Sequence, residues 1–470
     1  MEIDRILLVN ALQWHTEFVP EKILEFMILY EEARQINTVR DPFFTERGIE
    51  YPGPDSYSVS WGLLSVASVL LNEGFSVSCL QSNFFNDPAE FEREFESAVK
   101  KSSILGISCY TITYSNAVTL MKKAKTINPN IKIIIGGSHA TYEDYKAIND
   151  GADIVVRGFG ESRIRNVVKA LEKDEDLSHV PGITYSNQGK IRRTPEGDYP
   201  SLNEIPFPAF HLLPERVRKK STFGYETVRG CPFKCQFCIA SKTGVNERDL
   251  EKVFEDFAKL QDILSYNVLF LGDCTFNFSK KRVKRFCEFA RKEGLDIFFK
   301  VNFRPDMADR ATLDDMPQSN FVEIYVGCES GSNQVLGKMQ KGEVFEQYLQ
   351  FFKVAKGKLP RIGTSWMVGY PGETHQTVHE TILKLDYLYK KELITGSQPK
   401  IFIPFPGSPF YTDPAAFNMD IFTKDWDRYI EFSFPVHRLA GLSEFEIWGY
   451  FVQLLSVGLR HQLMRANLYE

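Results

Sequence analysis

The sequence predicts an α/β protein that contains two successive series of apolar strands separated by helices. The strand-like runs of the first series cover residues 5–10, 75–80, 103–108, 131–137 and 152–158. Those of the second series cover residues 225–230, 267–273, 296–303, 321–327, 361–369 and 400–405. Continuous β-branched runs that alternate with helical patterns are typical of parallel sheets with both faces covered. We therefore expect a doubly wound, Rossmann-like N-terminal sheet, followed by a second parallel α/β repeat.

Two further segments complete the expected organisation. Residues 196–220 contain four prolines and a basic cluster, which favours a connection over a regular element. Residues 413–470 are rich in aromatic side chains at helical spacing, which is more typical of a core than of a binding site. The expected domains are 1–195, a linker at 196–220, 221–412, and a small, mainly helical C-terminal segment at 413–470.

The bulk composition is that of an ordinary globular protein. The 470 residues include 56 basic and 61 acidic side chains, and the net charge of −5 gives no broad attraction to nucleic acid. The apolar stretch 448–459 is too short to span a bilayer, and the charged N-terminus is unlike a signal peptide. We therefore expect a cytoplasmic protein with no membrane or nucleic-acid partner.

Eight cysteines in so long a chain do not make a disulfide framework. We expect five of them to be scattered, buried thiols, namely Cys79, Cys109, Cys274, Cys287 and Cys328.

The other three cysteines, Cys231, Cys235 and Cys238, lie in the run TVRGCPFKCQFC. This spacing lets three thiolates face one point, and three thiolates on a four-iron cluster leave one iron open to another ligand. The alternatives are small buried residues, or zinc ligands that lack a fourth partner. Zinc usually takes paired Cys-x2-Cys motifs or histidines at a set distance, and the sequence nearby offers neither. The spacing therefore favours an iron–sulfur cluster.

Together with this loop, further motifs make the chain resemble the radical S-adenosylmethionine (SAM) enzymes over roughly residues 1–412. The motifs are LFLGDCTF (269–276), EIYVGCESGS (323–332), SWMVGYPGET (365–374) and IPFPGSPFY (403–411). Upstream, residues 132–162 are similar to the cobalamin-binding domain that precedes the radical domain in one large branch. The resemblance implies a partial (β/α)6 barrel, a [4Fe–4S] cluster on the three cysteines, SAM on its open iron, and cobalamin.

The resemblance also implies contacts for individual residues. Phe237 is expected near the adenine of SAM, and Gly272 with Asp273 replaces a Gly-Gly-Glu motif that meets the methionine ammonium. Glu329 and Ser330 are expected to contact the ribose or methionine, although Glu329 could instead be a helix N-terminal charge. Arg304 could pair with a carboxylate or form a structural salt bridge. The expected cobalamin contacts are Ser108, Gly136, Gly137, Ser138, His139, Gly158, Gly160 and Glu161.

One departure from the family concerns the cobalt ligand. Many cobalamin domains carry Asp-x-His-x-x-Gly, but alignment on Gly62 puts Tyr57 at the aspartate and Val59 at the histidine. His139 is not at a usual cobalt-ligand position in this branch. We expect the lower face of cobalt to be left to water, a nearby side chain or nothing. The alternative is a domain that keeps the fold without using cobalamin.

The resemblance implies a methyltransferase that acts on an unactivated carbon of a small or medium metabolite, through a 5′-deoxyadenosyl radical and methylcobalamin. A reductant such as flavodoxin or ferredoxin would be its partner, and a peptide substrate stays open. The alternatives are a radical cyclisation, rearrangement or deoxygenation without methyl transfer, and a non-catalytic electron-transfer or cofactor-carrying protein. No catalytic residue is assigned. Substrate identity is expected to be set between the two domains and by residues 413–470.

Overall fold

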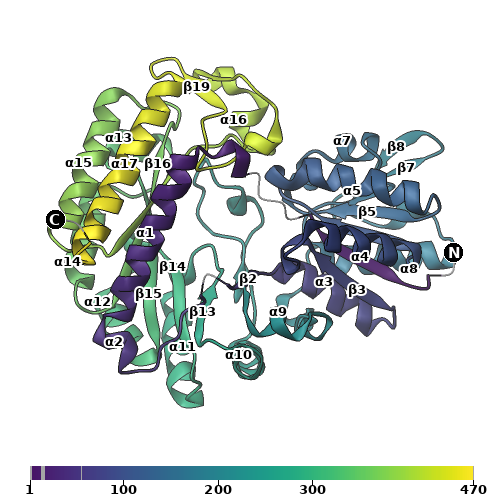
Figure 1. Ribbon diagram of the computed structural model, residues 1–470, viewed down its shortest axis with the longest axis horizontal. Helices are drawn as coiled ribbons and strands as arrows, with labels where there is room; N and C mark the ends of the chain where they lie inside the picture. The colour runs from purple at the N-terminus through teal and green to yellow at the C-terminus, as the bar shows by residue number, and fades with distance from the viewer. Residues whose placement is uncertain (1–2, 12–15, 54, 469–470) are drawn as a thin grey trace. The chain divides into compact units, whose positions relative to one another are not determined.

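The computed structural model describes residues 3–11, 16–53 and 55–468, and its contacts divide the chain into two compact units. The first unit comprises residues 1–15 and 54–223, and the second comprises 16–53 and 224–470 (Figure 1). Glu2, with which the charged N-terminus begins, lies outside the described residues. None of the described helices is both long and apolar enough to cross a membrane.

The first unit is built on a seven-stranded sheet of order β3-β1-β4-β5-β6-β7-β8. Its parallel strands are β3 (Val77–Gln81), β1 (Ile6–Asn10), β4 (Ile104–Ser108), β5 (Lys132–Gly136) and β6 (Ile154–Val156). These confirm the five predicted runs. The antiparallel hairpin of β7 (Ile183–Asn187) and β8 (Lys190–Arg193) was not predicted, because its strands are short and largely polar.

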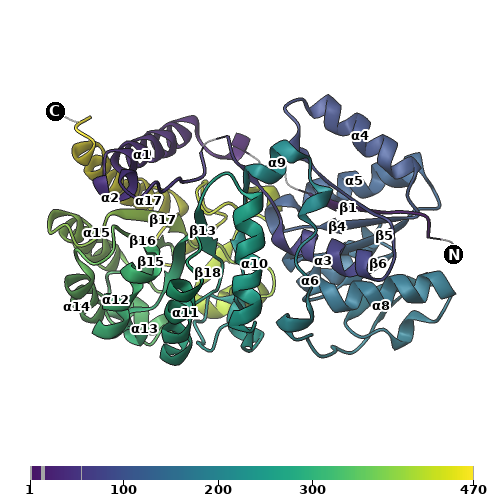
Figure 2. The same ribbon diagram turned by 90° about the horizontal axis from the view of Figure 1, so that it is seen from below.

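Helices cover both faces of this sheet, which confirms the doubly wound prediction. Helices α4 (Pro88–Lys100) and α5 (Tyr114–Ile127) pack on one face, and α3 (Trp61–Asn72) and α8 (Gly160–Lys173) pack on the other (Figure 2). The short helices α6 (Ser138–Tyr142) and α7 (Asp144–Asn149) connect β5 to β6. The chain order reverses between β1 and β4, and sheets of this kind bind ligands at the carboxyl ends of the strands near such a point.

The second unit contains a six-stranded parallel sheet of order β10-β13-β14-β15-β16-β17, as predicted. The strands are β10 (Gly224–Tyr225), β13 (Val268–Leu271), β14 (Phe298–Phe303), β15 (Phe321–Glu329), β16 (Arg361–Val368) and β17 (Gly396–Ile401). The connecting helices are α10 (Leu250–Ile263), α11 (Lys280–Glu293), α12 (Arg310–Asp315), α13 (Asn333–Lys338), α14 (Phe345–Ala355) and α15 (His375–Lys390). The last strand was predicted at 400–405, but β17 begins four residues earlier and pairs from Gly396 onward. The prediction missed this start because the strand opens with the polar run GSQPK. Pro399 is tolerated there because β17 lies at the sheet edge.

Helix α1 (Glu21–Val39) packs against α17 (Glu444–Arg465) and belongs to the second unit (Figure 1). The Ser397 amide donates to the Tyr30 hydroxyl (2.9 Å), and the Asn37 amide donates to the Gln462 carbonyl (3.2 Å). The short helix α2 (Pro42–Thr45) follows. The predicted domain 1–195 placed residues 16–53 with the N-terminal sheet. They belong instead to the second unit, as an insertion in the sequence of the first unit.

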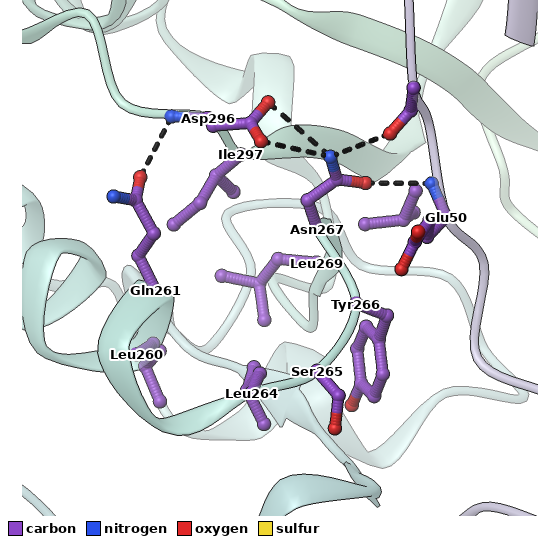
Figure 3. A pocket seen from close by; sticks show the side chains of 12 residues that line it. Glu50, Leu260, Gln261, Leu264, Ser265, Tyr266, Asn267, Leu269, Asp296 and Ile297 are labelled. Carbon is purple, nitrogen blue, oxygen red and sulfur yellow. Dashed lines mark hydrogen bonds between the residues drawn. The ribbon is translucent and has the colours of Figure 1, made fainter. Parts of the chain in front are cut away.

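Residues 16–53 are also held at the amino end of the barrel strands by Asn267, which lies beside a cavity of about 240 Å³ (Figure 3). The Asn267 side chain donates to the Gly48 carbonyl (3.1 Å) and accepts from the Glu50 amide (2.8 Å). It also donates to Asp296 (3.3 Å), which follows α11. Because chemistry in α/β barrels is found at the carboxyl ends of the strands, we assign this cavity a structural role.

The remaining segments refine the expected boundaries. The connection carries α9 (Glu215–Lys219) and belongs to the first unit, where β9 (Ser221–Thr222) pairs with β2 (Tyr57–Ser58). Residues 413–470 follow α16 (Pro409–Thr412) and pack within the second unit. They are less helical than expected, since β18 (Met419–Ile421) and β19 (His437–Leu439) form an antiparallel pair before α17.

The pH dependence of stability tests how β19 docks on the barrel. His437 is buried and its Nε2 donates to the Gly369 carbonyl (2.8 Å); burial lowers its pKa to about 4. The unfolded chain binds a proton on this histidine below about pH 6.5, whereas the folded chain does so only near pH 4. Stability should therefore fall between pH 6.5 and 4, by about 3 kcal/mol from this group. The His437→Gln variant should lose that part of the slope in thermal melts, while the exposed control His379→Gln keeps it. Equal slopes for both variants would contradict the assignment.

Candidate functional site

The cysteine loop lies at the carboxyl end of the barrel and follows β11 (Val228–Arg229), which pairs with β12 (Asn246–Glu247). Gly230 has φ of +80°, and a Cβ there would lie 1.6 Å from the Gly244 carbonyl oxygen. The turn into the loop therefore requires glycine. Cys231, Cys235 and Cys238 are all partly exposed.

In the described part of the chain, no three His, Cys, Asp or Glu side chains gather closely enough to hold one metal ion. Cys231, Cys235 and Cys238, which the spacing predicts as cluster ligands, lie in one loop.

Arg304, at the end of β14, connects the cysteine loop to the barrel. Its guanidinium stacks 3.7 Å from the centroid of the Phe233 ring, and its Nη1 lies 3.8 Å from Cys235 Sγ. Its other nitrogens donate to both carboxylate oxygens of Asp306 (3.0 and 2.8 Å). Arg304 thus forms a structural salt bridge, one of the two alternatives, and also contacts a predicted ligand.

A buried ion pair that the sequence analysis missed lies behind this contact. Lys341 Nζ is 2.9 Å from Glu343 Oε2, and Arg304 Nη2 donates to the Lys341 carbonyl (2.9 Å). Burial raises the pKa of the Cys235 thiol, and the Lys341 and Arg304 cations oppose that rise. Such cations favour the thiolate form, which is the form that binds metal.

Asp273 does not occupy an open ligand site, which corrects the expectation that its acid meets the methionine ammonium. The buried carboxylate accepts from the Thr227 amide (2.6 Å), the Thr227 hydroxyl (2.6 Å) and the Val228 amide (2.9 Å). Burial raises its pKa to about 6, although these hydrogen bonds favour the charged form. Asp273 therefore positions the strand that leads into the cysteine loop.

Gly272 also has a packing role, because a Cβ there would lie 3.1 Å from the Gly224 Cα of the neighbouring strand. Cys274, two residues later, is exposed, which corrects the expectation of a buried thiol. It lies beside the cysteine loop, since the Thr275 hydroxyl is 3.6 Å from Cys231 Sγ.

Glu329 ends β15 with φ of +62°, a conformation that residues other than glycine rarely adopt. The pairing of β15 with β16 shifts register between Gly327 and Glu329, and such irregularities often re-aim a side chain near a site. The Ser365 hydroxyl donates to Glu329 Oε1 (3.2 Å). Burial raises the pKa of Glu329, against the opposing charges of Lys341 and Lys400. The strained backbone and the raised pKa fit a binding role better than a helix-capping role.

Ser330, for which a contact with SAM is expected, is engaged within the fold. It is buried, its hydroxyl lies 3.2 Å from the Thr381 hydroxyl of α15, and it accepts from the Ser332 amide (3.1 Å). Ser330 therefore fixes the turn after β15.

Phe237 stays partly exposed next to Cys238, and its ring meets Tyr370 edge to face at 6.4 Å. The Tyr370 hydroxyl donates to Gln236 Oε1 (3.1 Å), and the Gln236 amide donates to the Met339 carbonyl (3.0 Å). These contacts fix the second half of the cysteine loop and leave part of the Phe237 ring accessible.

In the first unit, the predicted cobalamin contacts gather at the carboxyl ends of β4, β5 and β6. Ser108 is partly exposed at the end of β4, and Ser138 is exposed at the start of α6. Gly136 ends β5, and Gly158 has φ of +68° in the loop after β6. Large aromatic side chains are exposed at the same edge, namely Tyr110, Tyr142 and Tyr199. Small residues beside exposed rings fit a flat, largely apolar ligand.

Gly137 has a constraint of its own, because a Cβ there would lie 2.3 Å from the Cys109 carbonyl oxygen. The packing of two loops therefore requires this glycine before any ligand binds. Gly160 and Glu161 begin α8, where Glu161 is buried in the first turn. An acid at that position suits the positive end of the helix dipole.

Two buried arginines, which the sequence analysis missed, hold the loop after β6. Arg157 donates to the Ile183 carbonyl (2.8 Å) and pairs with Glu196 (3.0 Å). Arg163 donates to the Gly197 carbonyl (3.2 Å) and also pairs with Glu196 (3.2 Å). These contacts hold Glu196 and Gly197, in the connection after β8, against the loop that contains Gly158.

No histidine stands at the position of the usual cobalt ligand. Val59 is buried, and the Tyr57 hydroxyl accepts from Arg216 (2.8 Å). His139 is buried, with Nδ1 3.2 Å from the Thr111 hydroxyl and its ring 4.3 Å from the ring of Tyr114. Burial lowers its pKa to about 3. His139 therefore belongs to the core of this unit.

Comparison with known proteins matches both halves of the chain. The family model of the radical SAM superfamily matches residues 225–385, and that of the B12 binding domain matches residues 55–168. An uncharacterized methyltransferase of Pyrococcus horikoshii is 31% identical, over 82% of this chain and 84% of its own length. The anaerobic magnesium-protoporphyrin IX monomethyl ester cyclase of Rubrivivax gelatinosus is 24% identical, over 72% and 63%.

Two solved structures share the fold. The radical SAM methyltransferase TsrM from Kitasatospora setae, with cobalamin and a [4Fe–4S] cluster bound, has a TM-score of 0.70 at 15% identity, covering 97% of this chain and 89% of TsrM. The cobalamin-dependent SAM radical enzyme OxsB has a TM-score of 0.64 at 17% identity, covering 82% of this chain and 52% of OxsB. With the sequence matches, these findings show that the chain belongs to the radical SAM enzymes that carry a B12 binding domain.

Proposed function

We propose that this chain is a cobalamin-dependent methyltransferase that methylates an unactivated carbon of a small or medium metabolite. The observation that carries the proposal is the pairing of the two domains in one chain, each with the groups its cofactor needs. The methyltransferase description of the Pyrococcus relative and the fold of TsrM support it.

In this proposal, Cys231, Cys235 and Cys238 hold a [4Fe–4S] cluster, and Arg304 and Lys341 stabilise its negative charge. When bound, such a cluster supplies the electron for the reductive cleavage of SAM. Phe237 would contact the adenine, and Glu329 would accept from the ribose or methionine. The Asp273 and Ser330 side chains, for which contacts with SAM are expected, already form hydrogen bonds within the fold. A flavodoxin or ferredoxin would deliver the electron.

The edge formed by Ser108, Gly136, Ser138 and Gly158 would hold cobalamin, which supplies a transferable methyl group when bound. The exposed rings of Tyr110 and Tyr142 would cover its apolar surface. Because Val59 stands where the usual histidine would be, the lower face of cobalt would be left to water, a nearby side chain or nothing.

A radical cyclisation without methyl transfer is the second candidate, favoured by the similarity to the monomethyl ester cyclase. A non-catalytic carrier is less well supported, because a carrier does not need the strained Glu329 beside the cysteine loop.

A label-transfer experiment tests the proposal. The reconstituted, reduced enzyme with SAM labelled by CD3 at the methyl group should give a substrate product three mass units heavier than with unlabelled SAM. The triple variant Cys231→Ala, Cys235→Ala, Cys238→Ala should lose the cluster absorbance and all SAM cleavage, whereas the buried-thiol control Cys287→Ala keeps both. Turnover without label would support cyclisation, and SAM cleavage by the triple variant would refute the cluster assignment.

Electron paramagnetic resonance of the cob(II)alamin form tests the cobalt assignment. The spectrum should lack the nitrogen superhyperfine splitting that an axial imidazole produces, because Val59 stands where the histidine would be. The His139→Gln variant should leave the spectrum unchanged. Imidazole splitting that disappears in this variant would contradict the prediction, and failure to bind cobalamin would favour a domain that keeps only the fold.

A further inference from the structure

The interior of the barrel contains a cavity of about 540 Å³ that lies wholly within the second unit. Its walls are formed by residues of β13, β14, β15, β16 and β17, by α1 and by residues of the C-terminal segment. The apolar part is lined by Phe270, Val301, Pro399, Phe432, Phe451 and Leu455. A cavity of this size and composition suits a small or medium molecule with an apolar body.

The charged wall of the cavity is centred on Glu323 of β15. Lys300 Nζ lies 3.3 Å from Glu323 Oε2. Burial raises the pKa of Glu323, but Lys300, Arg361 and Arg34 outweigh that effect and hold the pKa below its usual range. One buried carboxylate is therefore surrounded by three cations.

The remaining charge beside Glu323 is Glu31, which is already engaged. Arg34 donates to both oxygens of Glu31, with Nε 2.8 Å from Oε2. Arg34 and Lys300 line the cavity together with the carboxylates Glu31 and Glu323, whereas Arg361 acts on Glu323 without lining the cavity. The five side chains together carry one surplus positive charge, which a ligand with one negative charge would neutralise.

Lys300 is the cation that is best placed to meet such a ligand. Its ammonium has three donors, and among the described residues its one ion pair is with Glu323. Its side chain is 27% exposed while it lines the cavity. The Lys300 ammonium also lies 5.7 Å from the centroid of the Tyr51 ring. Arg361 lies against the rings of Tyr51 and Phe44, at 5.2 and 5.9 Å, and does not line the cavity.

One side of the cavity lies near the carboxyl end of β14. Asn302, two residues beyond Lys300 on β14, also lines the cavity and donates to the Asp273 carbonyl (2.9 Å). A ligand whose anion rests on Lys300 would therefore direct its apolar body toward the carboxyl ends of the strands, where the cysteines lie.

We propose that this cavity is the substrate site and that it selects a mainly apolar molecule with a single carboxylate, which Lys300 binds. The inference rests on the proposed function, to which it adds a substrate class. It also assigns specificity to α1, because Tyr30 and Arg34 form one wall, in addition to the C-terminal segment.

Binding of a matched pair of probes to the full-length holoenzyme tests the inference. In calorimetric titrations, 4-phenylbutyrate should bind at least 10-fold more tightly than its uncharged analogue 4-phenylbutanamide, because a hydrogen bond to a charged group is lost in the amide. The Lys300→Met variant should weaken binding of the acid by a similar factor and leave the amide unaffected. The Lys300→Arg variant should retain the preference for the acid, and the exposed control Lys292→Met should bind like the wild type.

Equal binding of acid and amide, no binding of the acid, or tight binding of the acid by a folded Lys300→Met variant would overturn the inference. If Lys300→Arg retains the preference for the acid, substitution at this position does not by itself prevent folding. The loss in Lys300→Met can then be attributed to the missing positive charge. The titration does not depend on turnover. Selective binding without label transfer would therefore refute the methyltransferase proposal alone, and label transfer without selective binding would refute this inference alone.

Discussion

The position of the cysteine loop depends on one set of buried hydrogen bonds, those from Thr227 and Val228 to the Asp273 carboxylate. They join the end of β13 to the segment that enters the loop, where Gly230 makes a turn open only to glycine. Arg304 restrains the other side of the loop through Phe233 and Cys235. Three thiolates can serve one cluster only if the backbone between them is held in this way, so the chemistry of the barrel follows from these contacts.

The barrel contains two separate clusters of buried charge, one beside the cysteine loop and one around Glu323. Beside the cysteines, Arg304 and Lys341 offset the charge that thiolates and a cluster introduce, and the partly buried Glu329 faces them with a strained backbone. Lower in the barrel, Glu323 lies among the cations Lys300, Arg34 and Arg361, of which Lys300 and Arg34 line a mainly apolar cavity. Both regions place charge where water is scarce, and a buried charge of this kind is stable only with a partner.

The fold could largely be predicted, because apolar runs mark buried parallel strands in both sheets. Prediction failed where that signal fades. Strand β17 opens with polar residues and a proline, and the β7–β8 hairpin is short and charged. Helix α1 was assigned to the wrong unit, because no change of composition marks residues 16–53 as an insertion. The B12 binding domain match begins only at residue 55, after that insertion.

The cysteines could be predicted because their spacing alone carries the chemistry. The sequence correctly places Asp273 and Ser330 at the carboxyl ends of their strands. It contains no signal for their hydrogen-bond partners, Thr227 and Thr381, because these partners are distant in sequence. A cluster with one open iron, held by Cys231, Cys235 and Cys238, can be tested by pulsed electron–nuclear double resonance of the reduced protein with SAM labelled by ¹⁵N at the amino group. We expect a strong ¹⁵N coupling that disappears without the three cysteines; a cluster signal with no ¹⁵N coupling would refute binding of SAM to the open iron.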